Sequence, residues 1–153
     1  VINESVLAFV ENPQRALSEY VRVTKPGGYL GLNETTWIKT PPSTEVVEYL
    51  SSGFLGAKLE TADTWEELLA GLGLKDIVVR TYRLTALSDF IDRIKWFGPR
   101  DILLNWYRLL SQYTSSSANR RAIKEMLGII RNAPKNLYEY YGYGIYVGRK
   151  DRL

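Results

Sequence analysis

Apolar and polar residues follow two different periods along this chain. Apolar residues recur at helical spacing over residues 13–23, which predicts a helix that Asn12 caps and that Pro13 begins. The segment Lys25-Pro26-Gly27-Gly28 ends this helix, and we expect both glycines to supply a turn with positive φ. The short apolar run that follows, Tyr29–Glu34, predicts a buried parallel strand.

Residues 35–85 predict two helices and a second long strand. The segment from Thr35 reads as a loop that Pro41-Pro42 keeps out of a helix, with a helix to follow from Ser43 or Thr44. The spacing of Thr64 and Glu67 predicts a capping box for the next helix. Alternation over residues 75–85 predicts a strand with an irregularity near Thr81.

From Ser88 the pattern becomes helical and stays so to about Asn136, which predicts a helical insert over residues 88–136. One stripe in it comprises Ile102, Leu103, Trp106, Leu109, Leu110 and Tyr113, and a second comprises Ala122, Ile123, Met126, Leu127 and Ile130. The first stripe suits packing within the chain, and it also suits a partner or lipid face. The Tyr-rich segment after the insert predicts a last strand with its glycines on one face, where another backbone or a helix can approach closely.

This order of elements predicts an α/β fold in a single domain, 1–153, with the helical insert before the last strand. Composition narrows the chemistry. The chain has no Cys and no His, so thiolate sites, disulfides and His-based nucleophile pairs are excluded, and we expect no metal site. A net charge of +3 with scattered basic residues does not favour nucleic-acid binding. No membrane span or signal peptide is visible, and we expect a cytoplasmic protein.

The segment from Asn3 to Glu34 resembles the middle of a class I S-adenosylmethionine-dependent methyltransferase, of the subgroup that acts on small molecules, quinones and lipids. The matching residues are Val6-Leu7, Phe9-Val10-Glu11, Ala16-Leu17, Glu19, Arg22-Val23, Lys25-Pro26-Gly27-Gly28 and Glu34. The resemblance implies a partial Rossmann-like sheet with the equivalents of strands 4-5-7-6. In such a sheet the last strand of the chain runs antiparallel between the fifth and the sixth.

The chain departs from this family in one large respect. The glycine-rich loop and the acidic residue that bind the cofactor in the first half of the family's domain are absent from these 153 residues. The chain therefore resembles the C-terminal half of such an enzyme, beginning at the fourth strand. We expect the parent protein to use S-adenosylmethionine, and the isolated fragment to be inactive and to bind the cofactor poorly.

The resemblance also implies where a site lies. Asn3, Glu4 and Ser5 correspond to the tip of the fourth strand, which faces the cofactor in the family, with Leu7 and Phe9 nearby. Glu4 and Glu34 are the candidate catalytic carboxylates, although Glu4 alternatively caps the next helix and Glu34 alternatively is a surface loop acid. Glu34 and Trp37 are the candidate substrate contacts, and Trp37 alternatively belongs to the core.

Two functions remain open from the sequence. The first is the acceptor-side part of a methyltransferase that transfers a methyl group to a small-molecule acceptor. The second is a non-catalytic dimerisation or interaction module built on half a Rossmann-like sheet. Because the strand at one edge would lack neighbours, we expect the isolated chain to self-associate.

Overall fold

The computed structural model describes residues 1–53 and 56–152, which form two compact units. The first unit contains residues 1–84 and 136–153, and the second contains residues 85–135. The elements of the first unit are β1 (Ile2–Glu4), the 3-10 helix η1 (Leu7–Phe9), α1 (Pro13–Val23), β2 (Tyr29–Trp37), α2 (Thr44–Glu48), the π-helical turn η2 (Tyr49–Gly53), β3 (Glu60–Thr61), α3 (Ala62–Gly71), β4 (Lys75–Arg83), α6 (Leu137–Tyr140) and β5 (Tyr141–Arg149).

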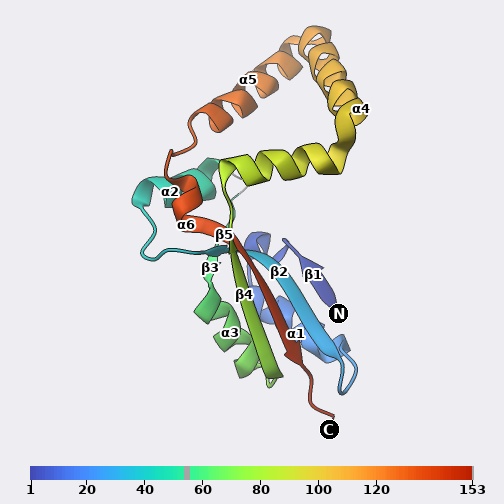
Figure 1. The fold of residues 1–153 in the computed structure, drawn as a ribbon, viewed down its shortest axis with the longest axis vertical. Coiled ribbons are helices and arrows are strands. Elements are labelled where there is room, and N and C mark those ends of the chain that lie inside the picture. The colour runs from blue at the N-terminus through green and yellow to red at the C-terminus, as the bar shows by residue number, and fades with distance from the viewer. Residues whose placement is uncertain (54–55, 153) are drawn as a thin grey trace. The chain divides into compact units, whose positions relative to one another are not determined.

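In the described residues, five strands form one sheet in the order β1-β2-β5-β4, with β3 paired to the far end of β2 (Figure 1). β1 runs parallel to β2, whereas β5 runs antiparallel to both β2 and β4. The expected 4-5-7-6 arrangement with an antiparallel last strand is therefore confirmed. The two-residue strand β3 has no counterpart in the sequence prediction, and β2 continues three residues beyond the predicted end at Glu34.

One face of the sheet carries the hydrophobic core, because α1 and α3 both pack on it. The buried core residues are Leu7, Leu17, Leu30, Leu32, Trp65, Leu69, Leu74 and Tyr146. The opposite face of β4 and β5 holds partly exposed side chains, including the stacked rings of Tyr82 and Tyr143, whose centroids lie 4.9 Å apart. Among the described elements of the first unit, the helices that join the core therefore lie on one side of the sheet.

The helix α1 forms for the reasons that the sequence predicts. The Asn12 side chain accepts a hydrogen bond from the Arg15 amide at 2.9 Å, and Pro13 occupies the first helical position. In the turn that follows, Gly27 has a φ of 73°. Gly28 does not share this positive φ; instead, a Cβ there would lie 2.9 Å from the Lys25 carbonyl oxygen, so the tight turn excludes a side chain.

The C-terminal end of α1 is held by a residue from the other end of the chain. The Lys150 ammonium group donates to the carbonyl oxygens of Val21 at 2.7 Å, Thr24 at 2.9 Å and Arg22 at 3.2 Å. These carbonyl oxygens lie at the last turn, where the helix offers them no N–H donor and where the negative end of its dipole lies. Lys150 directly follows β5, so its bonds hold the C-terminal end of β5 against the C-terminal end of α1.

Two sequence predictions about local structure are wrong. The cap of α3 is Thr61, whose hydroxyl accepts from the Thr64 amide at 3.1 Å, so the helix begins three residues before the predicted capping box. The irregularity in β4 lies between Lys75 and Val78, where Asp76 has a φ of 53°, and not near Thr81. Pairing is regular from Val78 to Arg83, so Tyr82 lies on the same face as Val78.

The glycines of β5 allow the close approaches that the sequence predicts. A Cβ at Gly142 would overlap the Tyr82 carbonyl oxygen and lie 2.7 Å from Cγ1 of Ile38. A Cβ at Gly148 would lie 3.0 Å from the Leu74 side chain. At Gly144 the space is taken by the phenol ring of Tyr146, whose Cζ lies 2.5 Å from the ideal Cβ position.

The second unit consists of two helices, α4 (Ala86–Ser115) and α5 (Ser117–Arg131). Gly98 has non-helical angles (φ 67°, ψ 160°) and precedes Pro99, so α4 breaks there into two segments. Ser116 caps α5 by accepting from the Asn119 amide at 3.1 Å. Within the described ranges, no helix is both long enough and apolar enough to cross a bilayer.

Candidate functional site

The carboxyl ends of β1 and β2 meet at one edge of the sheet, which is where open α/β sheets bind ligands. The chain leaves the sheet at Ser5, which has a left-handed φ of 51° and whose amide donates to the Asn33 carbonyl at 2.7 Å. Few non-glycine residues adopt this conformation, and those that do are often found at functional sites. We call residues Ser5–Leu7, which connect β1 to η1, the β1 loop.

Glu34 holds the β1 loop in place from the neighbouring strand. Its Oε1 atom accepts hydrogen bonds from the Asn3 side-chain amide at 2.6 Å, the Val6 amide at 3.1 Å and the Leu7 amide at 3.0 Å. Glu34 is completely buried and lies within β2, so the interpretation of it as a surface loop acid at the strand end is wrong. Three donors from one short segment thus converge on a single oxygen.

Asn3 connects this arrangement to α1. Its side chain is 8% exposed, donates to Glu34 through Nδ2, and accepts a hydrogen bond from the Tyr20 hydroxyl at 3.4 Å through Oδ1. The strand β1, the strand β2 and the helix α1 are therefore joined through one buried amide. Buried polar networks of this kind fix a single arrangement of the segments that they connect.

The other candidate residues lie elsewhere. Glu4 is exposed and pairs in register with Asn33, on the opposite face of the sheet from Asn3 and Glu34. Trp37 is half-buried at the last position of β2, where it pairs with Tyr141. The structure therefore brings together Asn3, Ser5 and Glu34, and it separates the two candidate carboxylates, Glu4 and Glu34. Of the two neighbours, Leu7 belongs to the core and Phe9 is exposed.

The buried hydroxyl of Tyr146, which the sequence analysis did not place in the site, lies on the same face of the sheet as Glu34. Among the described residues, Glu34 Oε2, the Tyr146 hydroxyl and Trp65 Nε1 are buried without a well-formed hydrogen bond. Burial raises the pKa of Tyr146; proximity to Thr36 lowers it, and the Glu34 and Asp63 carboxyl groups raise it further. The interruption of the glycine series by Tyr146 is the one signal in the sequence that marks this position.

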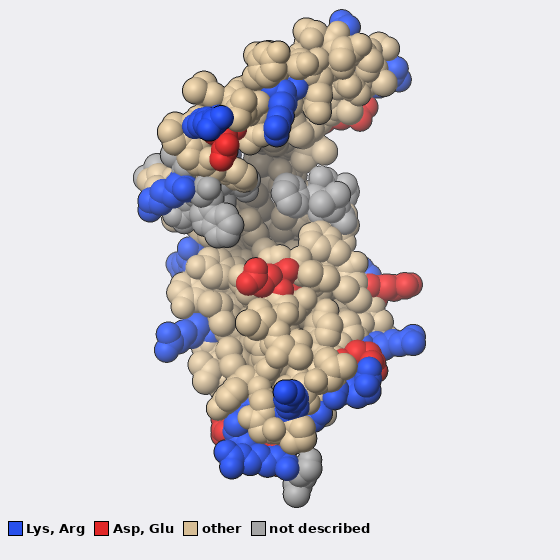
Figure 2. Space-filling view, turned by 90° about the vertical axis from the view of Figure 1, so that its right-hand side faces the viewer, with Lys and Arg blue, Asp and Glu red and all other residues tan. Residues whose placement is uncertain are grey.

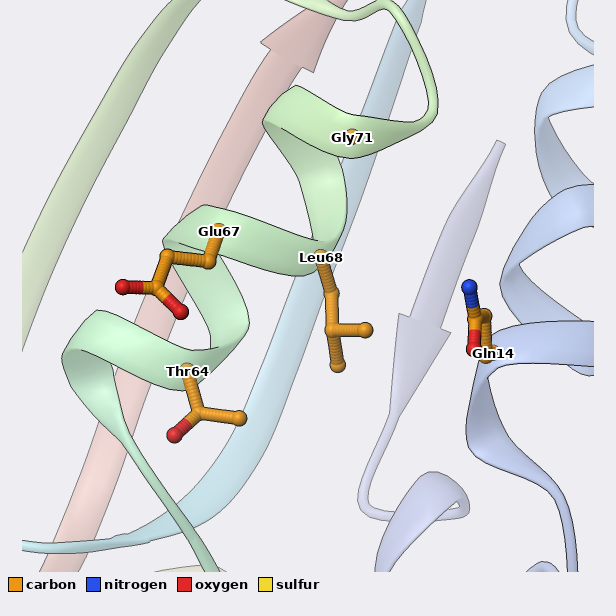
Figure 3. Close-up of a pocket in the computed structure, with 5 residues that line it drawn as sticks. All are labelled: Gln14, Thr64, Glu67, Leu68 and Gly71. Carbon is orange, nitrogen blue, oxygen red and sulfur yellow. The ribbon is translucent and has the colours of Figure 1, made fainter.

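A shallow groove of about 210 Å³ lies between α1 and α3 (Figure 3). It is lined by Gln14, Thr64, Glu67, Leu68 and Gly71, and Gln14 faces the side chains of α3 from across the gap. None of the predicted site residues lines it, and its volume is below the range of about 300–1,000 Å³ that is usual for ligand pockets. Within the described ranges, no three Asp or Glu side chains are grouped to hold a metal ion.

Comparison with known proteins supports the interpretation of the fold. The model of a methyltransferase-domain family matches residues 1–32, which include β1, α1 and the start of β2. No curated protein matches the chain at a significant level. Among solved structures, phosphoethanolamine N-methyltransferase 2 from Haemonchus contortus superposes on 99% of this chain with a TM-score of 0.67 and 16% identity, over 33% of its own length. The fold is that of the S-adenosylmethionine-dependent methyltransferases.

Two other solved structures that superpose on this chain differ in their described activities. A putative methyltransferase from Bacillus halodurans has a TM-score of 0.54 and 16% identity, with coverage of 99% of this chain and 68% of its own. The cyclase SpnF has a TM-score of 0.59 and 19% identity, with coverage of 98% and 48%. The chain thus spans between 33% and 68% of the length of these three proteins. SpnF is described as a cyclase, so the methyltransferase fold alone does not fix the reaction.

Proposed function

We propose that this chain is the acceptor-side part of an S-adenosylmethionine-dependent methyltransferase that transfers a methyl group to a small-molecule acceptor. The observation that carries the proposal is the β1 loop. It lies at the carboxyl edge of a 4-5-7-6 sheet, and two of its amides, with the side chain of Asn3 in β1, donate hydrogen bonds to Glu34. Phosphoethanolamine N-methyltransferase 2, which has this fold, was crystallised with S-adenosylhomocysteine.

The residues at this edge fit one part of the cofactor. Glu4 has an exposed carboxylate beside Ser5, and a carboxylate can accept hydrogen bonds from the ammonium group or the ribose hydroxyls of S-adenosylmethionine. Asn3 and Ser5 flank Glu4, and their hydrogen bonds to β2 fix the backbone that carries it. We propose that Asn3, Glu4 and Ser5 form the cofactor side of the site, and that most other cofactor contacts come from outside these 153 residues.

S-adenosylmethionine would supply an activated methyl group on a sulfonium leaving group. What remains for the protein is to position the acceptor in line with that methyl group and, where needed, to remove a proton. Glu4 is the exposed carboxylate of the two candidates, so we assign the proton-accepting or cofactor-binding role to Glu4. We assign to Glu34 a positioning role, because it is buried and accepts hydrogen bonds from two amides of the β1 loop and from Asn3.

Trp37 completes the proposal on the acceptor side. It ends β2 at the same edge of the sheet and is half-buried, so its ring is available to line a pocket for a small acceptor. Glu34 would influence the acceptor only indirectly, through the strand that carries both residues.

Calorimetric titration of the intact protein with S-adenosylmethionine tests the function. We expect Glu4→Gln to weaken binding without changing the unfolding midpoint, because Glu4 is exposed. We expect Glu34→Ala to weaken binding and to lower the midpoint, because it leaves two backbone amides and the Asn3 amide without their acceptor. Glu34→Gln keeps an acceptor oxygen and should retain most of both properties.

The outcomes separate the two functions. If the intact protein does not bind S-adenosylmethionine, the methyltransferase proposal fails and a non-catalytic interaction module becomes the better interpretation. If it binds, but Glu34→Gln abolishes methyl transfer while leaving cofactor affinity and stability unchanged, then Glu34 is a catalytic group and its positioning role is wrong. The isolated 153 residues should bind the cofactor far more weakly than the intact protein.

A further inference from the structure

The second segment of α4 presents an apolar stripe to solvent. Leu103, Trp106, Tyr107 and Leu110 follow the i, i+3, i+4, i+7 spacing of one helix face, and they are between 61% and 72% exposed. Exposed apolar residues are common singly, but a contiguous row of large ones on one face indicates a binding surface. The less exposed residues of this segment, Ile102, Leu109 and Tyr113, lie along one flank of this row, beside Trp106.

The helix α5 also exposes large apolar side chains. Ile123 is buried, whereas Met126, Leu127 and Ile130 remain substantially exposed. The two helices contact one another, with the Arg120 guanidinium 5.8 Å from the centre of the Tyr113 ring. The pair therefore forms a hairpin whose mutual contacts leave much of its apolar surface free.

Basic residues adjoin the apolar ones. Arg120, Lys124 and Arg131 fall on the same helical row as Leu127, and Arg100 falls one turn before Leu103. Residues 85–135 carry nine Lys or Arg and four Asp or Glu, a net charge of +5, whereas the rest of the chain carries −2. Figure 2 shows basic side chains among the uncharged surface of this unit, with few acidic ones on the face in view.

We propose that the α4–α5 hairpin docks on an anionic lipid surface. Apolar rows flanked by Lys and Arg, with Trp and Tyr among the apolar residues, are the features of helices that lie in a membrane interface. Charge decides against the main rival, a second copy of the hairpin, because two units of +5 brought face to face repel each other. A surface rich in phosphatidylserine or phosphatidylglycerol instead supplies the complementary charge.

Flotation of the intact protein with lipid vesicles tests this proposal. We expect binding to phosphatidylcholine vesicles that contain about one third phosphatidylserine, weak binding to phosphatidylcholine alone, and loss of binding at high salt. The double variant Arg120→Gln/Lys124→Gln should bind about 25-fold more weakly, since each basic residue contributes about fivefold near an anionic surface. Lys25→Gln/Lys58→Gln, which removes the same charge from exposed positions of the first unit, is the matched control and should change binding little.

A second variant tests the contribution of the exposed apolar row. Leu103→Ser/Leu110→Ser should reduce vesicle binding at least tenfold while leaving the unfolding midpoint unchanged. The proposal is overturned if the chain does not bind anionic vesicles, or if the control pair weakens binding as much as the hairpin pair. A fall in the midpoint of the Leu variant would show that the stripe packs within the protein. A loss of self-association in sedimentation experiments with the Leu variant would identify a second copy as the occupant, and either result also overturns the proposal.

Discussion

Replacing Gly142 with alanine should disrupt the junction between β4 and β5. Gly142 pairs with Arg83, and its missing Cβ would overlap the backbone carbonyl oxygen of Tyr82 and lie 2.7 Å from Cγ1 of Ile38. Carbon atoms in contact normally lie about 3.5–4.0 Å apart, so both neighbours would have to move. A side chain can rotate away, but the Tyr82 carbonyl belongs to the sheet backbone and moves only with its strand.

The size of the effect follows from this difference. Overpacking usually costs about 1–3 kcal/mol, and the backbone contact places Gly142→Ala at the upper end, at about 3 kcal/mol. Gly31 provides a matched control, since it lies in β2 of the same sheet and has no atom within 4 Å of its ideal Cβ position. Alanine there should be neutral or stabilising by about 0.5 kcal/mol, because glycine lowers strand stability.

Urea unfolding of both variants, followed by circular dichroism and tryptophan fluorescence, measures the difference. We expect a midpoint for Gly142→Ala well below that of the wild type, with Gly31→Ala at or above it. A stability within about 0.5 kcal/mol of the wild type for Gly142→Ala would refute the reasoning about the close approach. Equal destabilisation by both substitutions would also refute it, because any side chain would then be costly in this sheet.

Three further predictions concern other positions. Lys150→Met should lower the unfolding free energy by about 2 kcal/mol through loss of the bonds to the last turn of α1, whereas Lys75→Met should have little effect; urea titration compares them. Tyr146→Phe should be neutral or stabilising by about 1 kcal/mol near pH 8, since it removes a buried hydroxyl that lacks a well-formed bond in the described residues. Because burial raises the pKa of Tyr146, the folded state keeps its proton where the unfolded state loses it, so wild-type stability should fall above about pH 10 and the variant should fall less steeply. The isolated chain should self-associate through the free edge of β1, and a strictly monomeric sedimentation profile across a dilution series would contradict this.

The elements that the sequence predicts well are those whose causes are local. Asn12 and Pro13 begin α1, and Gly27 turns the chain after it, because each acts on residues within one turn of itself. The strand order was available only through the resemblance, since no periodic pattern states which strands are neighbours. The π-helical turn after α2 and the small strand β3 left no signal in the pattern of apolar residues.

The candidate site was predictable in part, for a different reason. The resemblance pointed to Asn3, Ser5 and Glu34, which the structure brings together. The role of Glu34 was hidden because its partners, the amides of Val6 and Leu7, lie 28 and 27 residues earlier and have no side-chain identity to recognise. The role of Lys150 leaves no signal in the sequence either, because it bonds residues more than 120 positions away. A hydrogen bond between a side chain and a backbone group far away in the sequence depends on the assembled fold, so the sequence pattern does not predict it.

The position of β5 in the sheet has a consequence for how the chain matures. β5 lies between β2 and β4, yet it follows both in the sequence and follows the whole helical insert (Figure 1). A nascent chain that has left the ribosome only as far as α5 therefore holds β2 and β4 with no strand to join them. Pairing across such long separations is slow, because the entropy of closing the loop is lost before the contacts form. During synthesis, the sheet edges of β2 and β4 should therefore be the surfaces that a chaperone protects.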